Sequence, residues 1–325
     1  MARSRVAPCL LLLLTSLPAA RAFSAAGLGQ LDARRTGAGL AANPVRMCAA
    51  GDRDLLIVGA GTLGSLIVKQ HRAAFPTARI VAETRSTTRH DALRADGAET
   101  RTSEEAALSA ETMANVVFCV APGGNDDYVA NVRRALALWK GAPGKFVFTS
   151  SGGIFAEQDG GVVDETSALS SAPRSQKLVD CEKAVTDGGG TVLRLAGLYN
   201  LDRGAHSYWL SQGKVDARPD GLIGLVSYED SAGAALAALK CEADIGGEVF
   251  LICDGVEQTR LDICTSALKT EKFKDGKIPE FTKTEGPIGK RYGVKKATEV
   301  LKWVPTHKSW DAFCLAHAPA TAAKA

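Results

Sequence analysis

The stretch LLIVGAGTLG, residues 55–64, places a G-x-G-x-x-G turn directly after a run of apolar residues. The apolar run is typical of a buried strand, and the residues that follow the turn, 65–69, can continue as a helix. In that setting Gly59 allows a tight turn, Gly61 lets the backbone approach a pyrophosphate, and Gly64 lets the helix pack closely on the strand. We therefore predict a dinucleotide site, with a purely structural glycine turn as the alternative. The predicted contacts in this turn are Gly59, Gly61, Thr62, Leu63 and Gly64.

Residues 1–22 are typical of a signal peptide. A basic start precedes an apolar core that is shorter than the roughly 20 residues of a membrane span, and Ala20-Arg21-Ala22 is an A-x-A cleavage signal. Residues 23–50 hold three arginines, one acidic residue and many Ala and Gly, which is typical of a transit peptide. This two-part presequence resembles that of algae whose plastids came by secondary endosymbiosis. We therefore expect import into a plastid stroma, with plain secretion as the alternative.

The mature chain of about 280 residues is long enough for one full-sized domain. The formal net charge of +3 includes the basic presequence, so the mature part is close to neutral and gives no strong signal for a nucleic-acid partner. It contains no predicted membrane span. Its cysteines show no spacing that suits a metal, so we predict no metal site and expect buried free thiols in a reducing compartment. The expected partner is a small-molecule substrate, and a homodimer is left open.

Predicted strands and helices alternate along the mature chain. The apolar runs at 79–82, 115–120, 145–149 and 191–195 are predicted strands that follow the first one. Strands that are apolar on both faces and alternate with helices are typical of a parallel sheet covered on both sides. We therefore predict an α/β fold with a doubly wound parallel (Rossmann) sheet.

The chain is expected to divide into a core and a smaller lobe. Residues 51–200 are the predicted dinucleotide-binding core, and 201–317 are a mixed substrate lobe that completes the fold. The tail, 318–325, is expected to be disordered. Ligands of doubly wound sheets bind outside the carboxyl ends of the strands, so the loops at that edge supply the other predicted cofactor contacts. These are Thr84, Arg85, Ser86, Val120, Ala121, Pro122, Ser150, Ala196, Gly197 and Leu198.

The segment FTSSGGIF, residues 148–155, resembles the Ser-Ser-x-x-Val-Tyr segment of the extended short-chain dehydrogenase/reductase superfamily, the epimerase/dehydratase group. The segments VDET at 163–166, LRLAGLY at 193–199 and VSYED at 226–230 agree with it, and GKRY at 289–292 resembles an atypical branch. The resemblance implies an NAD(P)-binding oxidoreductase or epimerase that acts on a small carbonyl or sugar-like substrate.

The chemistry of that superfamily combines a nicotinamide, a Tyr whose pKa is lowered by a Lys four residues on, and a Ser or Thr. The resemblance implies that Ser151 is the catalytic hydroxyl. Counting back from Glu182, it puts Arg174 at the position of the Tyr and Leu178 at that of the Lys. Arg cannot donate a proton at neutral pH and Leu carries no charge, so the Tyr/Lys pair is absent. We expect Arg174 to anchor an anionic group of the substrate.

Two other groups could supply a proton. Tyr292 and Lys296 have the spacing of the missing pair, but they lie far beyond the strand that should precede it, and we interpret the match as chance. His206 could serve as a replacement acid, although a surface-loop histidine is the simpler interpretation. Two functions therefore remain: an atypical NADP-dependent reductase or epimerase, and a catalytically silent NADP-binding regulator or plastid RNA-associated scaffold.

The turn after the second strand bears on the choice between NADP and NAD. NAD-specific sites place a carboxylate there to hold the ribose 2′-hydroxyl. By resemblance to the Thr-Arg-Ser turn of the superfamily, this chain has Thr84 at that position, followed by Arg85 and Ser86. A guanidinium can grip a 2′-phosphate, so we predict NADP. If the strand ended one residue earlier, Glu83 would take the carboxylate's place and NAD would be preferred.

Overall fold

The computed structural model of this protein describes residues 52–123 and 127–319. The predicted signal peptide (1–22) and transit peptide (23–50), and all but the first two residues of the predicted tail (318–325), lie outside the described residues. Within the described ranges, no helix is long and apolar enough to cross a membrane.

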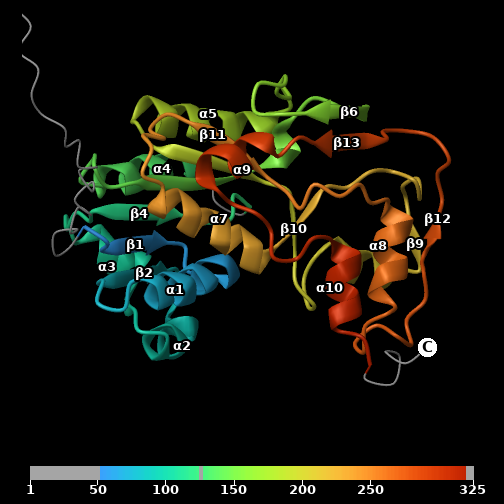
Figure 1. The fold of residues 1–325 in the computed structure, drawn as a ribbon, viewed down its shortest axis with the longest axis horizontal. Coiled ribbons are helices and arrows are strands. Elements are labelled where there is room, and N and C mark those ends of the chain that lie inside the picture. The colour runs from blue at the N-terminus through green and yellow to red at the C-terminus, as the bar shows by residue number, and fades with distance from the viewer. Residues whose placement is uncertain (1–51, 124–126, 320–325) are drawn as a thin grey trace, which may run out of the picture. The chain divides into compact units, whose positions relative to one another are not determined.

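A sheet of seven parallel strands forms the centre of the fold, in the order β3-β2-β1-β4-β5-β7-β11. Four of these strands, β1, β2, β4 and β11, are labelled in Figure 1. The strands are β1 (Leu55–Val58), β2 (Ile80–Thr84), β3 (Glu99–Thr102), β4 (Asn115–Phe118), β5 (Phe146–Ser151), β7 (Thr191–Leu195) and β11 (Val249–Ile252). The chain order reverses between β1 and β4, which is the strand order of the Rossmann fold. The predicted fold class is confirmed.

Helices cover both faces of the sheet because its strands are apolar on both sides. In β1, Leu55 and Ile57 face a core shared with α1 (Thr62–Ala74) and α7 (Tyr228–Lys240), whereas Leu56 faces the opposite core. The opposite face is covered by α4 (Tyr128–Ala137) and α5 (Pro173–Asp187). The alternation of side chains along a strand produces this division.

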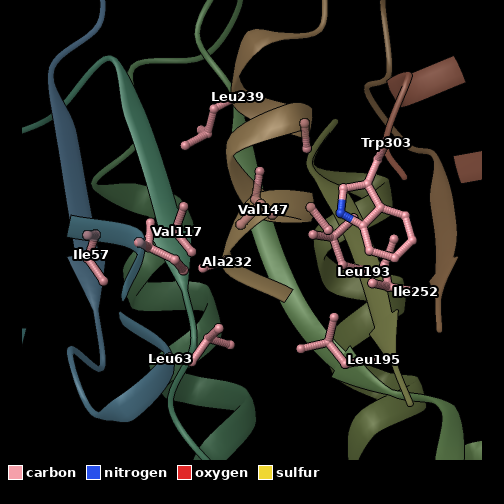
Figure 2. Packing of buried hydrophobic residues seen from close by; sticks show 14 of the residues in the cluster. Ile57, Leu63, Val117, Val147, Leu193, Leu195, Ala232, Leu239, Ile252 and Trp303 are labelled. Atoms are coloured by element: carbon pink, nitrogen blue, oxygen red, sulfur yellow. The ribbon is translucent and has the colours of Figure 1, made fainter. Parts of the chain in front are cut away.

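Small side chains allow α7 to lie close to the sheet. Ala232 and its neighbouring alanines on α7 are buried, and Figure 2 shows Ala232 near Val117 and Val147 of the central strands. Ser227, the residue before the helix, caps its N-terminus, since its hydroxyl accepts the N–H of Asp230. A tightly packed core of this kind fixes the strand ends to which the loops of the site are attached.

The chain after residue 200 contributes both to the main sheet and to the smaller elements beside it. This part of the chain provides β11 at the edge of the main sheet. It also contributes strands to three two-stranded parallel pairs, two of which include a strand from before residue 200. These pairs are β8 (Gly197–Tyr199) with β10 (Leu225–Ser227), β9 (Lys214–Val215) with β12 (Glu280–Phe281), and β6 (Asp159–Val163) with β13 (Gly289–Tyr292). The other helices are α2 (His90–Ala95), α3 (Ser103–Ala107), α6 (Ala205–Leu210), α8 (Arg260–Ala267), α9 (Lys295–Leu301) and α10 (Trp310–Ala316).

Candidate functional site

The glycine turn between β1 and α1 is held by close packing. Gly59 has a φ of +94°, and a Cβ on it would lie 2.6 Å from the backbone nitrogen of Val120. A Cβ on Gly64 would lie 2.9 Å from the carbonyl oxygen of Gly59 and 3.1 Å from Sγ of Cys119. The N–H groups of Gly59 and Ala60 both donate to the carbonyl oxygen of Glu83, at 3.0 and 2.9 Å. The turn is therefore fixed to β2 and requires glycine at both positions.

Gly61 differs from these two glycines because nothing crowds it. It is exposed, and a Cβ on it would meet only the carbonyl oxygen of Gly59, at 3.9 Å. Gly61 is the N-cap of α1 and provides no side chain to cap the first N–H groups of the helix, which have no acceptor within it. Leu63 is in the core, so only its backbone can reach a ligand. The turn thus has free donors and open space where a phosphate can enter.

Arg203, which the sequence analysis missed, adds a positive charge beside this turn. It comes from the loop after β8, and its Nη1 lies 3.5 Å from Oγ1 of Thr62. Because Arg203 is exposed and the contact is long, its guanidinium can turn toward an anion at the start of α1. No local pattern marked it, since it lies 141 residues from Thr62.

At the end of β2, the carboxylate of Glu83 is paired with arginines, whereas the guanidinium of Arg85 is free within the described chain. Glu83 is buried and forms ion pairs with Arg101, at 3.3 Å, and with Arg134. Thr84 is also buried, and its hydroxyl is shared between the carbonyl oxygen of Ser86 and Nε2 of His90, both at 2.8 Å. Arg85 is exposed and makes no hydrogen bond or ion pair with any other described residue. Glu83 therefore belongs to β2 and is occupied by two arginines, and the guanidinium of Arg85 in the turn after it is available to an anion.

The loops after β4 and β7 reach the same edge of the sheet. Val120 accepts the hydroxyl of Tyr128 at 2.8 Å through its carbonyl oxygen, and the next two residues are exposed. Ala196 is buried, and its N–H donates to Ile252, whereas Gly197 is exposed. The structure thus brings the predicted contacts of both loops to the carboxyl edge. These are Val120, Ala121, Pro122, Ala196, Gly197 and Leu198.

Ser150 belongs to a buried network that ties α5 to the sheet. Its hydroxyl donates to Oε1 of Glu182 at 2.6 Å, and Nη2 of Arg194 lies 2.8 Å from Oε2 of the same carboxylate. All three side chains are buried. The hydroxyl of Ser150 is committed to this network, so only its backbone is left for the predicted cofactor contact.

Ser151, the next residue, keeps its hydroxyl hydrogen available. It is half-buried at the end of β5, and its Oγ accepts the N–H of Gly153 at 3.1 Å. At the two positions of α5 assigned to the Tyr and the Lys, the structure has an exposed Arg174 in the first helical turn and Leu178 packed in the core. Ser151 can therefore donate a hydrogen bond to a substrate oxygen, whereas these positions of α5 provide no hydroxyl.

Tyr292 lies beside the turn that follows Ser151. The pairing of β13 with β6 brings it there, and its hydroxyl is 3.3 Å from the carbonyl oxygen of Gly152. Lys296 is engaged elsewhere, since its Nζ donates to Glu248 and to the carbonyl oxygen of Val249 at the start of β11. The Tyr292–Lys296 spacing therefore does not form a catalytic pair, although Tyr292 by itself lies next to the turn that follows Ser151, which its sequence position did not indicate.

His206 is a core residue, so the expectation of a surface-loop histidine is wrong. It is 1% exposed and stacks on Trp310 with ring centroids 4.3 Å apart. Burial lowers its pKa to about 4. Because it is neutral and enclosed at neutral pH, it cannot serve as the replacement acid. Across residues 52–123 and 127–319, no three His, Cys, Asp or Glu side chains are grouped to hold a metal, and the cysteines are free.

No protein-family model and no curated protein matches this chain, but solved structures do. A functionally unknown conserved protein from Silicibacter pomeroyi is 21% identical with a TM-score of 0.66, over 81% of this chain and 97% of that one. UDP-glucuronic acid 4-epimerase from Bacillus cereus, in complex with NAD, is 17% identical with a TM-score of 0.65, over 81% and 97%. dTDP-glucose 4,6-dehydratase from Bacillus anthracis, in complex with NAD, is 15% identical with a TM-score of 0.66, over 81% and 94%. The chain therefore has the fold found in an epimerase and a dehydratase that were solved in complex with NAD.

Proposed function

We propose that this chain, which has the fold of epimerases and dehydratases solved with NAD, is an NADP-dependent oxidoreductase or epimerase. Its substrate is a small carbonyl or sugar-like compound. The observation that carries the proposal is the open space at Gly61, where α1 begins at the point of strand reversal. A glycine turn needed only for packing would be crowded at all three glycines, as it is at Gly59 and Gly64.

Three parts of the chain would hold the cofactor. The first N–H groups of α1 would bind the pyrophosphate, with Arg203 beside them. The exposed guanidinium of Arg85 would bind the 2′-phosphate, because the carboxylate of Glu83 is already paired and cannot repel it. When bound, the nicotinamide supplies or accepts a hydride at a carbon that bears oxygen.

Ser151 and Arg174 would act on the substrate. The hydroxyl of Ser151 donates to the substrate oxygen while its Oγ is held by Gly153, so that the donor is already oriented. The exposed Arg174 holds an anionic group of the substrate by a charge-assisted bond. We further propose that the protein works in a plastid stroma after loss of its two-part presequence.

The alternative is a catalytically silent NADP-binding protein, which could be a regulator or a plastid RNA-associated scaffold. One observation favours it: α5 has a guanidinium and a core leucine, Arg174 and Leu178, at the positions assigned to the proton-transfer pair. Such a protein would keep the glycine turn and Arg85 because they serve binding, and would lose only the groups needed for turnover.

The mature protein, beginning near Met47, should be titrated with NADPH and NADH and then screened for turnover of carbonyl substrates. We expect NADPH to bind more tightly than NADH, and hydride transfer to at least one carbonyl compound. NADPH binding without turnover in a broad screen would favour the silent alternative. Failure of both dinucleotides to bind would refute the proposal.

A further inference from the structure

A cavity of about 150 Å³ lies between the loop after β11, the residues before β10, and strand β13. Its volume could hold on the order of ten water molecules, or one small organic molecule. Tyr292 lines it, and the hydroxyl of Tyr292 is 3.3 Å from the carbonyl oxygen of Gly152, the residue after Ser151. Tyr292 is therefore shared by the wall of the cavity and the turn that follows Ser151.

Gln258 is an unpaired polar group in the wall of this cavity. It is 6% exposed, and both Oε1 and Nε2 of its amide are buried without a hydrogen-bond partner among the described residues. Its backbone is fixed, since its carbonyl oxygen accepts the N–H of Ile223 at 2.9 Å. A buried amide of this kind is costly when it is unpaired, and one donor and one acceptor are free to bind a ligand.

Lys290 provides a cation in the same wall. It is 8% exposed, and its Nζ donates to the carbonyl oxygen of Phe155 at 2.8 Å, but it forms no ion pair with any carboxylate in the described ranges. The neighbouring Arg291 is already satisfied by Glu257, at 2.6 Å, and by the carbonyl oxygen of Gly160. Burial lowers the pKa of Lys290, and a bound anion would offset that cost. Glu157 acts on Lys290 only through space and forms no ion pair with it, so Lys290 is the cation of the wall without a directly paired carboxylate among the described residues.

We infer that this cavity binds a small organic acid that carries a hydroxyl near its carboxylate. Nζ of Lys290 and Nε2 of Gln258 donate to the carboxylate, and Oε1 of Gln258 accepts from the hydroxyl. The amide of Gln258 needs both a donor and an acceptor on the ligand, which a hydroxy acid supplies and an anion without an O–H group does not. The assignment of this acid as the substrate rests on the proposed function, whereas its binding can be tested separately.

The test compares acids with their uncharged counterparts on the mature protein. Glycerate and glucuronate are titrated against glycerol and glucose, with inorganic phosphate as an anion without a carbon skeleton, by ligand-observed NMR and calorimetry. We expect the two acids to bind at least tenfold more tightly than the matched alcohols and than phosphate. Equal binding of alcohol and acid, equal binding of phosphate, or no binding of any probe would overturn the inference.

Variants of the cavity wall test whether the acids bind in this cavity. Lys290→Met and Gln258→Leu should each weaken binding of the acids at least tenfold, the effect of losing one charge-assisted hydrogen bond. Lys290→Arg keeps the charge and should retain part of the affinity, which separates loss of charge from loss of fold. Lys283→Met is the matched control, since Lys283 is exposed and pairs with Asp216 at 2.7 Å away from the cavity lining. Wild-type affinity in Lys290→Met would overturn the inference.

A titration with NADPH on the same samples separates the two proposals. NADPH binding without acid binding refutes the cavity assignment and leaves the proposed function intact. Acid binding that depends on Lys290, without binding of either dinucleotide, supports the cavity and refutes the proposed function.

Discussion

Gly61→Val should abolish dinucleotide binding while leaving the protein folded. The Cβ of the new side chain would meet only the carbonyl oxygen of Gly59, at 3.9 Å, so the core is not disturbed. The valine would instead fill the space through which a pyrophosphate approaches the first N–H groups of α1. The effect on binding and the effect on folding can therefore be separated at this residue.

The expected magnitudes differ for the two effects. Each hydrogen bond from the backbone to a charged phosphate is worth about 1.5–3 kcal/mol, so losing one or more should raise Kd roughly tenfold to several hundredfold. The free energy of unfolding should fall by only about 1 kcal/mol, because valine is a poorer N-cap residue than glycine. By contrast, Gly64→Ala places a Cβ 2.9 Å from the carbonyl oxygen of Gly59, and should cost about 1–3 kcal/mol of stability.

Calorimetric titration with NADPH, together with urea unfolding of each variant, measures both quantities. Gly213→Val is the matched control, since Gly213 is exposed with nothing within 4 Å of its built Cβ and lies outside the turn. It should bind NADPH like the wild type. Unchanged affinity in Gly61→Val would refute the assignment of the turn as the pyrophosphate site.

Further predictions concern cofactor choice, turnover, the mature N-terminus and the pH dependence of stability. Arg85→Ala should weaken NADPH binding about tenfold or more and leave the affinity for NADH unchanged. Arg94→Ala, which removes another exposed arginine, on α2, is the control. An unchanged Kd for NADPH in Arg85→Ala would contradict the assignment of Arg85 to the 2′-phosphate. Ser151→Ala should lower kcat roughly tenfold or more on any carbonyl substrate that is turned over, and an indifferent enzyme would place the site elsewhere. Mass spectrometry of the native protein should find its first residue within 47–51; a secreted form that starts at residue 23 would exclude plastid import. Burial raises the pKa of Asp254 from 3.8 to about 7, so the folded state retains a proton that the unfolded chain releases. Stability should therefore fall by up to roughly 4 kcal/mol between pH 4 and 7, and Asp254→Asn should remove that slope in urea unfolding.

The strands of the sheet were predictable where burial on both faces leaves a continuous apolar run. The runs at 115–120 and 191–195 correspond to β4 and β7. The edge strand β3 (Glu99–Thr102) was not predicted, because it is polar and is held by backbone pairing with β2. Its composition has a reason in the structure: Arg101 of β3 pairs with the buried Glu83. A polar edge strand has no pattern of its own to distinguish it from a loop.

The residues of the candidate site also divide into those that the sequence predicts and those that it does not. The glycine turn and Arg85 follow directly from local motifs, because the residues that act together are neighbours in the sequence. Tyr292 and Lys290 reach the turn after Ser151 only through the pairing of β13 with β6, which joins segments more than a hundred residues apart. The sequence contains no local signal for that pairing. His206 likewise looked like a loop residue because its partner Trp310 lies on a distant helix.

Two cations of the described chain, Arg85 and Lys290, are the ones proposed above to bind anionic ligands. The buried carboxylates are neutralised within the protein. Glu83 forms ion pairs with Arg101 and Arg134, and Glu182 forms one with Arg194. Such buried pairs stabilise the arrangement of strands and helices only while both partners are present. Arg85 at the end of β2 and Lys290 at the cavity have no carboxylate partner among the described residues. Lys290 is largely removed from water, so a bound anion would offset part of the cost of its burial, whereas Arg85 is exposed and its guanidinium is available to an anion. A phosphorylated dinucleotide at Arg85 and a carboxylate at Lys290 would complete this pattern.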